Sequence, residues 1–118
     1  MGTLKIKRVY EPAEESDGFR LLVDRIWPRG VTKEAAQVDV WLKEIAPSAG
    51  LRKWFQHDVK KWASFAEKYK AELKESPAMN ELKTYLQEHK TTTLLYGAKD
   101  EQHNQAVVLQ AYLENHDV

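Results

Sequence analysis

Residues 21–30, LLVDRIWPRG, begin as an apolar run and end as a polar turn. The apolar part lies within residues 19–26, and a continuous apolar centre is typical of a strand covered on both faces, as in α/β folds. The residues that follow this centre are Asp24, Arg25, Trp27, Pro28, Arg29 and Gly30. A core strand that ends in two guanidinium groups, a carboxylate and an indole predicts a ligand site or a salt-bridged corner, and the sequence favours the ligand site.

The bulk composition indicates a folded protein without a broad basic surface. With 118 residues the chain can bury one substantial core, and we expect a single domain over residues 1–118. Hydrophobic residues make up 42% and charged residues 31% of the chain, which is typical of globular proteins. The 18 basic and 18 acidic residues balance, whereas an extended duplex of nucleic acid requires an excess of Lys and Arg. A small local anion site is compatible with this balance.

Several functional classes lack their sequence signals. The chain has no cysteine, which excludes disulfides, thiol nucleophiles and thiolate metal sites. No apolar run approaches the length of a membrane span, and the first residues alternate in polarity, unlike a signal peptide. There is no phosphate-binding loop, dinucleotide fingerprint, nucleophilic-serine motif or metal-ligand spacing. We therefore expect a cytoplasmic protein with no cofactor, no metal and no membrane contact.

The hydrophobic pattern predicts an α/β fold. Strands are expected over residues 3–9, 19–26 and 91–98, with a short, ambiguous strand within 38–45. Caps at Thr32, Ser48 and Ser76 start helices, and residues 105–114 form the last helix. Long helices that feed an apolar strand imply crossovers, so the sheet should be small, mainly parallel and sandwiched by helices.

A stripe of aromatic residues marks the middle of the chain. After Ser48, apolar side chains recur at steps of three and four over about six turns, with a bend expected at His57 and Asp58. Such a stripe is more typical of a core than of a cofactor site. We expect one shared buried face for Trp54, Phe55, Trp62, Phe65 and Tyr69.

Polar runs follow both of the most apolar strands. Residues 24–30 follow one strand, and residues 99–106, KDEQHNQA, follow the other. In open α/β sheets, ligands bind beyond the carboxyl ends of the strands. If the two strands are parallel, both polar runs reach the same edge and form one candidate site.

The first run supplies groups that suit an anion. Arg25 and Arg29 offer fork-shaped donors for carboxylate or phosphate. Trp27 offers a flat face for stacking, and Gly30 permits a positive φ or the close approach of a ligand. Each also has a structural interpretation, because Arg25 could pair with neighbouring carboxylates and Trp27 could pack at a corner.

The second run adds charge and proton-transfer groups. Lys99 is cationic, and Asn104 or the preceding turn can cap the last helix, whose free N–H groups favour an anion. Asp24, Asp100 and His103 are the candidate proton-transfer groups. Single charged residues in turns are, however, most often solvated.

Four blocks of the sequence resemble a known family. RLLVDRIWPRG, WLKEIAPSAGLRKWFQHD, WASFAEKYKAEL and TTTLLYGAKDEQHNQAVVLQAYL together are similar to the YeaO-like branch of domain-of-unknown-function family 488, over about residues 3–114. The resemblance implies a small bacterial cytosolic α/β protein and no particular reaction. Gly97 departs slightly from the family pattern. The resemblance brings in Lys43 and Arg52 as candidate ligand-binding residues, and Ser48, also a motif residue, is a third candidate. Arg52 gains nothing from the dipole at a helix start, so we expect it to have another partner.

Two main functional classes remain open. In an enzyme acting on a small anionic, nucleotide-like substrate, the cations hold the anion, Trp27 or Tyr96 stacks, and one of the proton-transfer groups acts. A non-catalytic module that binds a nucleotide, a single strand of nucleic acid or a protein tail needs the same cations and aromatic rings but no proton-transfer group. A third class, a structural or regulatory partner protein, needs only an apolar surface patch. We expect a small anionic ligand as the partner, and the sequence leaves the oligomeric state open.

Overall fold

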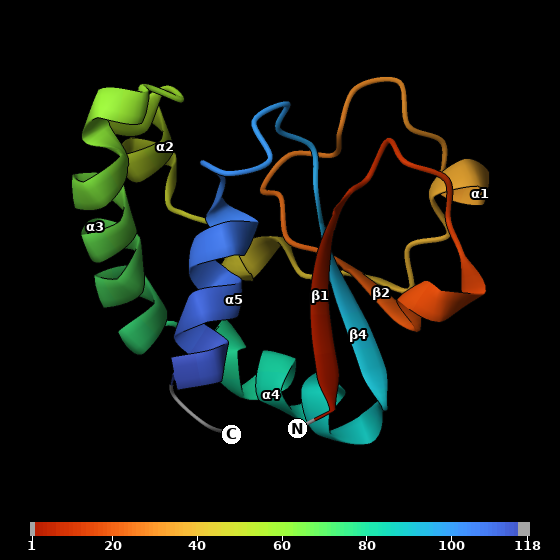
Figure 1. Ribbon diagram of the computed structural model, residues 1–118. Coiled ribbons are helices and arrows are strands. Elements are labelled where there is room, and N and C mark those ends of the chain that lie inside the picture. Colours follow the sequence, from red (N-terminus) through yellow and green to blue (C-terminus); the bar gives the residue numbers. More distant parts are fainter. Residues whose placement is uncertain (1, 116–118) are drawn as a thin grey trace.

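A parallel sheet forms the centre of the molecule. The computed structural model describes residues 2–115, and within them four strands lie in the order β1-β4-β2-β3, with every neighbouring pair parallel (Figure 1). The strands are β1 (Thr3–Arg8), β2 (Phe19–Leu22), β3 (Val40–Trp41) and β4 (Thr91–Tyr96). The predicted α/β class with a mainly parallel sheet is confirmed.

The two most apolar strands are adjacent at the centre of the sheet. Leu21 of β2 lies opposite Leu94 of β4, and Leu22 lies opposite Leu95; all four side chains are fully buried. The ladder extends one step further, because the N–H of Val23 donates to the Leu95 carbonyl at 3.0 Å. Since β2 and β4 run in the same direction, the polar runs that follow them reach the same edge, as predicted.

All four strands are shorter than expected, β1 by a single residue. The strand predicted over residues 19–26 ends at Leu22, and β4 ends at Tyr96 instead of residue 98. Beyond the ends of β2 and β4 the two chain segments are joined by a side chain instead of the backbone ladder, because the Gly97 N–H donates to the Asp24 carboxylate. The strand expected within residues 38–45 keeps two residues, because Lys43–Ile45 coils into a 3₁₀ turn.

Two of the three predicted caps, at Thr32 and Ser48, start their helices, whereas the third helix has Pro77 in the N-cap position and begins at Ala78, one residue later than predicted. Thr32 Oγ1 accepts from the Ala35 N–H, and Ser48 Oγ accepts from the Leu51 N–H, at 3.1 and 3.2 Å. The predicted bend is present: the chain turns after Phe55 and restarts through a 3₁₀ turn, Val59–Lys61. The α-helices are α1 (Lys33–Ala36), α2 (Ala49–Phe55), α3 (Trp62–Lys74), α4 (Ala78–Glu88) and α5 (Gln105–Asn115).

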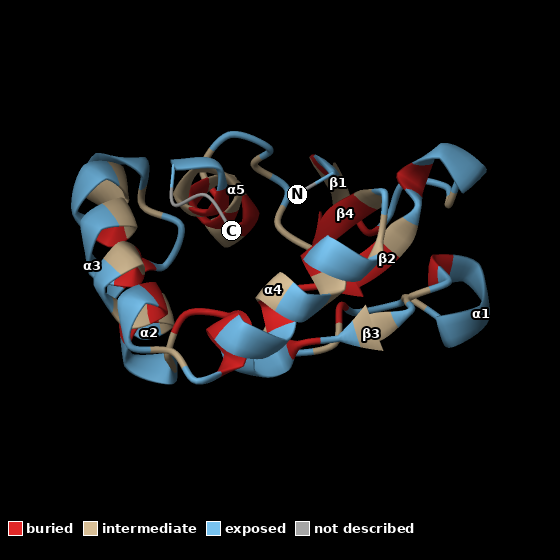
Figure 2. Cartoon of the chain, turned by 90° about the horizontal axis from the view of Figure 1, so that it is seen from below, coloured by how far each residue is buried: buried red, intermediate tan, exposed pale blue. Residues whose placement is uncertain are grey.

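The helices are distributed unequally over the two faces of the sheet. Figures 1 and 2 show α2, α3, α4 and α5 on one side and the short α1 with its loops on the other. The larger core cluster lies between the four helices and the sheet, and a smaller one on the opposite face consists of Val9, Leu22, Ala36 and Leu95. No helix within residues 2–115 is long and apolar enough to cross a membrane.

The aromatic stripe forms a core, with one exception. Phe55, Phe65 and Tyr69 are buried, and the Phe55 and Phe65 rings stack with centroids 4.2 Å apart. Trp62 is partly buried against them. The prediction was wrong for Trp54, which is 37% exposed and lies within 5.1 Å of the Lys61 and Lys68 ammonium groups. Adjacent residues of a helix point about 100° apart, and in α2 Phe55 is buried in the core whereas Trp54 is exposed.

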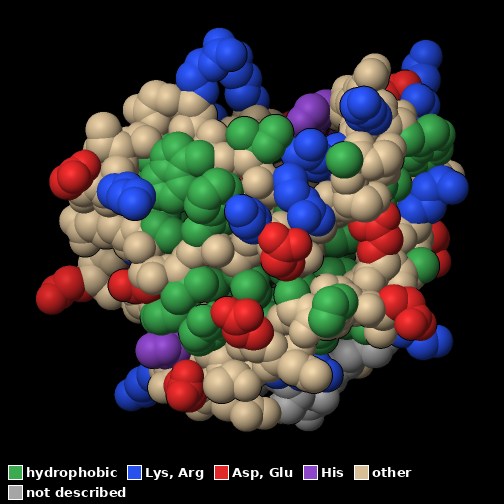
Figure 3. All heavy atoms as spheres, turned by 180° about the vertical axis from the view of Figure 1, so that it is seen from behind, with side chains coloured by type: hydrophobic (Ala, Val, Ile, Leu, Met, Phe, Trp, Pro, Cys, Tyr) green, Lys and Arg blue, Asp and Glu red, His purple; other side chains and the backbone are tan. Residues whose placement is uncertain are grey.

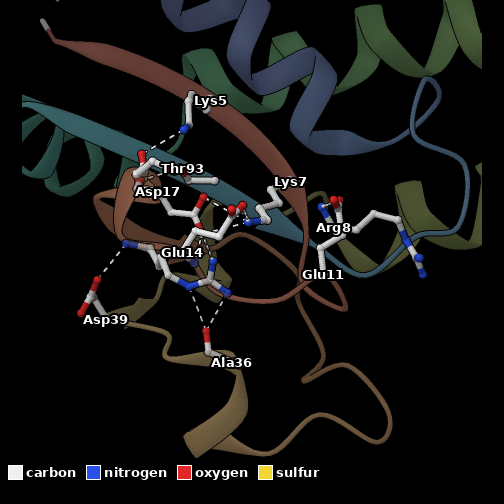
Figure 4. A network of polar contacts seen from close by, with 11 residues as sticks. Lys5, Lys7, Arg8, Glu11, Glu14, Asp17, Ala36, Asp39 and Thr93 are labelled. Carbon is white, nitrogen blue, oxygen red and sulfur yellow. Dashed lines mark hydrogen bonds and ion pairs between the residues drawn. The ribbon is translucent and has the colours of Figure 1, made fainter.

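A buried ionic cluster occupies the face of the sheet opposite the four helices (Figure 4). The Asp17 carboxylate lies 2.5 Å from the Arg20 guanidinium and 3.1 Å from the Lys7 ammonium, and Asp17 and Arg20 are almost fully buried. Arg20 also donates twice to the Ala36 carbonyl. Burial alone would raise the pKa of Asp17, but the Glu14 N–H and the two cationic side chains hold this pKa below its ordinary value.

Candidate functional site

A cavity of about 560 Å³ opens at the carboxyl edge of the sheet. This volume lies within the range of small-molecule sites, roughly 300–1,000 Å³. Apolar side chains form much of its wall, among them Pro28, Pro47, Phe55 and Phe65. Of the residues predicted for the ligand site, those that line the cavity are Asp24, Arg25, Trp27, Arg29, Arg52 and Asn104.

Asp24 holds a fixed carboxylate in this cavity. The Gly97 N–H donates to one carboxylate oxygen at 2.9 Å, and the Gln105 side-chain amide donates to the other. The indole N–H of Trp41 holds the Asp24 backbone carbonyl at 2.7 Å. Burial raises the pKa of Asp24 to about 6, although the bonds from Gly97 and Gln105 and the charge of Arg52 act to lower it. The group therefore titrates close to neutral pH.

Gly97 leaves the space that Asp24 occupies. A Cβ at this position would lie 2.7 Å from the Asp24 carboxylate oxygen and 3.5 Å from the Pro28 ring. Because real Cβ atoms essentially never approach another atom this closely, a side chain here would displace the carboxylate. Gly97, which departs slightly from the family pattern, thus allows the hydrogen bond to Asp24 that joins the ends of β2 and β4.

Arg25 contacts neighbouring residues of the fold, and both Arg25 and Arg52 have a buried donor without a hydrogen-bond partner. Arg25 donates to the Ala46 carbonyl at 3.1 Å and lies 3.4 Å from the exposed Glu44 carboxylate. The Nε atoms of Arg25 and Arg52 are buried and have no hydrogen-bond partner within residues 2–115. A buried donor without a partner is costly, and both residues line the cavity.

Trp27 and Arg29 complete the side of the cavity formed by the first polar run. The Trp27 indole N–H donates to the Val31 carbonyl at 2.7 Å, and its ring meets Trp41 edge to face at 5.4 Å. The backbone carbonyl of Arg29 accepts from the Tyr10 hydroxyl at 2.8 Å, and the Arg29 side chain is exposed. Figure 3 shows Lys and Arg side chains gathered beside a hydrophobic patch on the face turned away in Figure 1.

His57 lines the cavity although its sequence context indicates only a hinge. It has a φ of 56° and follows Gln56 with a φ of 45°, so two successive residues other than glycine adopt left-handed backbone. Such conformations cost free energy and often occur at functional sites. The charge of His57 acts on the Asp24 carboxylate and favours its ionised form.

Asn104 and Gln105 bring α5 to the cavity. The Asn104 side chain is buried, accepts from the Val107 N–H at 3.1 Å and donates to the Asp100 carbonyl at 2.9 Å. It therefore caps α5, as predicted, and also lines the cavity. The sequence did not single out Gln105, because an uncharged amide at a helix start carries no distinctive signal.

Seven candidate residues do not line the cavity: Gly30, Lys43, Ser48, Tyr96, Lys99, Asp100 and His103. Ser48 caps α2 and donates to Glu72 at 2.6 Å. The Lys43 ammonium lies 5.4 Å from the Trp41 ring. These contacts give both residues a structural role.

The other two predicted proton-transfer groups, Asp100 and His103, lie together in the turn before α5. Asp100 accepts from the N–H groups of Gln102 and His103, and its other oxygen lies 2.9 Å from His103 Nδ1. The Gln102 N–H and the His103 side chain together hold the pKa of Asp100 below its ordinary value. Of the three predicted groups, Asp24 is thus the one on the cavity wall. No group of three or more His, Asp or Glu residues within residues 2–115 could hold a metal ion.

The fold and the cavity define a class, a small parallel α/β protein with an arginine-lined cavity at the carboxyl edge of its sheet. The chain belongs to the DUF488 family, because the profile described as "Inactive DUF488-N3 subclade" matches residues 3–117. This match confirms the resemblance seen in the sequence.

Related proteins cover most of the chain. It is 45% identical to the uncharacterized protein YeaO of Escherichia coli (strain K12) over 112 residues, which is 95% of this chain and 97% of the relative. It is 44% identical over 80 residues to the uncharacterized protein Rv3073c of Mycobacterium tuberculosis (strain ATCC 25618 / H37Rv), or 68% of each chain. A search of solved structures gave no significant match.

Proposed function

We propose that the cavity binds a small phosphate- or nucleotide-like anion and that the protein acts by binding it. The observation that carries this proposal is the pair of buried, unpartnered Nε donors on Arg25 and Arg52. Both residues line the cavity, and Arg29 adds a third guanidinium. A guanidinium fork matches the oxygens of a phosphate or carboxylate and remains charged at any working pH.

The walls favour an anion that also has an apolar or planar part. Trp27 offers an indole held by its own hydrogen bond, and Phe55 and Phe65 contribute aromatic surface. A small ligand gains most of its affinity from such surface, and its orientation is set by a few placed polar groups. A nucleotide combines both requirements.

The word "inactive" in the description of the matching subclade favours binding over catalysis. One observation favours the second candidate, an enzyme: Asp24 lies in the cavity with a pKa of about 6, which suits a general base near neutral pH. Incubating the protein with a bound anion and following the ligand by NMR distinguishes the two. Turnover that Asp24→Asn abolishes would establish the enzyme.

A binding titration tests the main proposal. AMP and inorganic phosphate are added at low salt, where electrostatic attraction is least screened, and tryptophan fluorescence is followed because Trp27 lines the cavity. We expect AMP to bind and Arg52→Gln to weaken this binding by about tenfold or more, the loss of one charged hydrogen bond.

Lys53→Gln provides the matched control. Lys53 is the next residue of α2, is exposed and does not line the cavity. This variant removes the same charge from the same helix and should change affinity less than about threefold, in keeping with a screened surface charge. The proposal fails if neither AMP nor phosphate binds to the wild type at millimolar concentration.

A further inference from the structure

The cavity contains a carboxylate that a site for a bare anion would not need. Asp24 lines the same space as Arg25, Arg29 and Arg52. An ionised carboxylate beside a bound anion repels it, and this repulsion is strong where water is partly excluded. Three arginines without Asp24 would form a tighter site for phosphate alone. Asp24 also joins the strand ends through Gly97, but a ligand that offers its carboxylate a hydrogen-bond donor would convert the repulsion into a favourable contact.

We propose that the ligand carries a hydroxyl or ammonium donor close to its anionic group and that Asp24 accepts the hydrogen bond from this donor. The inference rests on the proposed function, because it names the chemical class of the same ligand. α-Hydroxy acids, α-amino acids and nucleotides with ribose hydroxyls belong to this class. Simple carboxylates and inorganic phosphate do not.

Asp24 is held as a fixed acceptor. One contact comes from the N–H of Gly97 after β4, one from the Gln105 amide on α5, and one from Trp41 to the backbone carbonyl. An ionised carboxylate has about four acceptor positions. The Gly97 N–H and the Gln105 amide use two of them. No other hydrogen bond within residues 2–115 uses the carboxylate, and Asp24 lines the cavity.

The charged and titratable neighbours of Asp24 support the ionised form at neutral pH. Arg52 of α2 and His57 beyond it both favour the charged carboxylate. Tyr69 of α3 is buried, and its hydroxyl donates to the Ile45 carbonyl, so its hydrogen is already used. The other two donors to the carboxylate, the Gly97 N–H after β4 and the Gln105 amide on α5, are uncharged. Asp24 is therefore mainly an acceptor at pH 7.5, and it becomes a donor at acidic pH.

Two matched pairs of ligands test the inference. AMP is compared with 2′,3′-dideoxyAMP, and 3-phenyllactate with 3-phenylpropanoate, by titration calorimetry at pH 7.5. Each pair differs only in hydroxyl groups. Wherever a pair binds, we expect the hydroxylated member to bind at least about tenfold more tightly, because its absence leaves a polar group unpaired. Phenylalanine serves as the ammonium-bearing member of the second series.

Two variants separate recognition of the donor from recognition of the anion. Asp24→Asn should reduce the preference within a pair to about threefold or less. Arg52→Gln should weaken both members equally and leave the preference unchanged. Circular dichroism checks that both variants fold. Should Asp24→Asn fail to fold, the second pair is compared in the wild type at pH 8 and at pH 5. The preference for the hydroxylated member should be smaller at pH 5, because Asp24 is then protonated.

The outcomes distinguish this inference from the proposed function. Equal binding of both members of each pair overturns the inference and leaves anion binding intact. A preference that persists in Asp24→Asn, or in the wild type at pH 5, also overturns it, because the donor is then recognised elsewhere. If no anion binds at all, the proposed function fails and this inference fails with it.

Discussion

Arg25 and Arg29 leave the same turn but have different surroundings. The Arg25 side chain donates to the Ala46 carbonyl and lies beside Glu44. The Arg29 side chain is exposed at the cavity, with no hydrogen bond or ion pair to residues 2–115. Arg25 thus contributes both to a corner of the fold and to the cavity, and Arg29 contributes to the cavity alone.

Replacing each arginine separates these roles. Arg29→Ala should change the free energy of unfolding by less than about 0.5 kcal/mol, as for an ordinary surface residue. Arg25→Ala should cost about 1–3 kcal/mol, because the backbone carbonyl that it serves loses its donor. Urea denaturation measures both. Equal losses in the two variants would mean that Arg29 is also structural.

Asp24 makes stability depend on pH in an unusual direction. Its pKa is raised from 3.8 to about 6 on folding, so the protonated form favours the folded state. This contribution is fully present below about pH 4 and is lost as the pH rises through 6. At 1.36 kcal/mol per pKa unit the loss is about 3 kcal/mol at most.

The comparison with Asp24→Asn isolates this contribution. Unfolding free energies of both proteins are measured between pH 4 and pH 8, and the other titrating groups cancel in the difference. The wild type should lose about 2–3 kcal/mol relative to the variant across this range. A constant difference would show that the carboxylate is solvated and has an ordinary pKa.

The sequence predicted the strand-end residues of the site, and the family resemblance added Arg52, but His57 and Gln105 were missed. Asp24, Arg25, Trp27 and Arg29 follow an apolar strand, so the carboxyl-edge rule places them. His57 reaches the cavity through two left-handed residues, a conformation that no residue type there requires. A hinge of this kind depends on tertiary packing.

At the level of elements, the two helices α2 and α3 contribute a single aromatic layer. Phe55 of α2 stacks on Phe65 of α3, and Phe65 continues to Tyr69 at 5.9 Å. The left-handed turn after α2 is what allows the two helices to share this layer. The helical period predicted the layer but also assigned Trp54 to it, although Trp54 points about 100° away from Phe55 around α2 and is exposed.

A pair of substitutions tests this assignment. Phe65→Ala should reduce the free energy of unfolding by about 3–5 kcal/mol, since it leaves a cavity in the core. Trp54→Ala should cost less than about 1 kcal/mol, because its ring is exposed and lies beside the Lys61 and Lys68 ammonium groups. Comparable losses would show that Trp54 packs on the core.

At the level of the whole molecule, the two faces of the sheet are stabilised differently. One face buries an apolar core beneath four helices, and the other buries Asp17, Arg20 and most of Lys7 beside a small apolar cluster. The continuous apolar centre of β2 correctly predicted a strand covered on both faces. It did not predict this cluster, since the acidic partner comes from a loop whose composition indicates solvent exposure.

Asp17→Asn should therefore cost about 3 kcal/mol or more at pH 7, because two buried cations lose their charged partner. The lowered pKa of Asp17 means that this stabilisation is present above pH 4 and is lost as the pH falls through the folded-state pKa. The penalty should thus shrink in acid, the opposite of the Asp24 effect. Glu14→Gln, which removes an exposed partner of Lys7, should cost less than about 1 kcal/mol. A similar cost for both variants, measured by urea denaturation, would contradict a special role for the buried carboxylate.

The position of β4 at the centre of the sheet has a consequence for synthesis on the ribosome. β1 and β2 are not neighbours, and each pairs with β4, which is translated some 70 residues or more later. Pairings between distant segments form slowly, and unpaired apolar strands attract other chains. A nascent chain that has not reached Thr91 has no partner for β1, so its strands remain available to chaperones until residue 96 has left the ribosome.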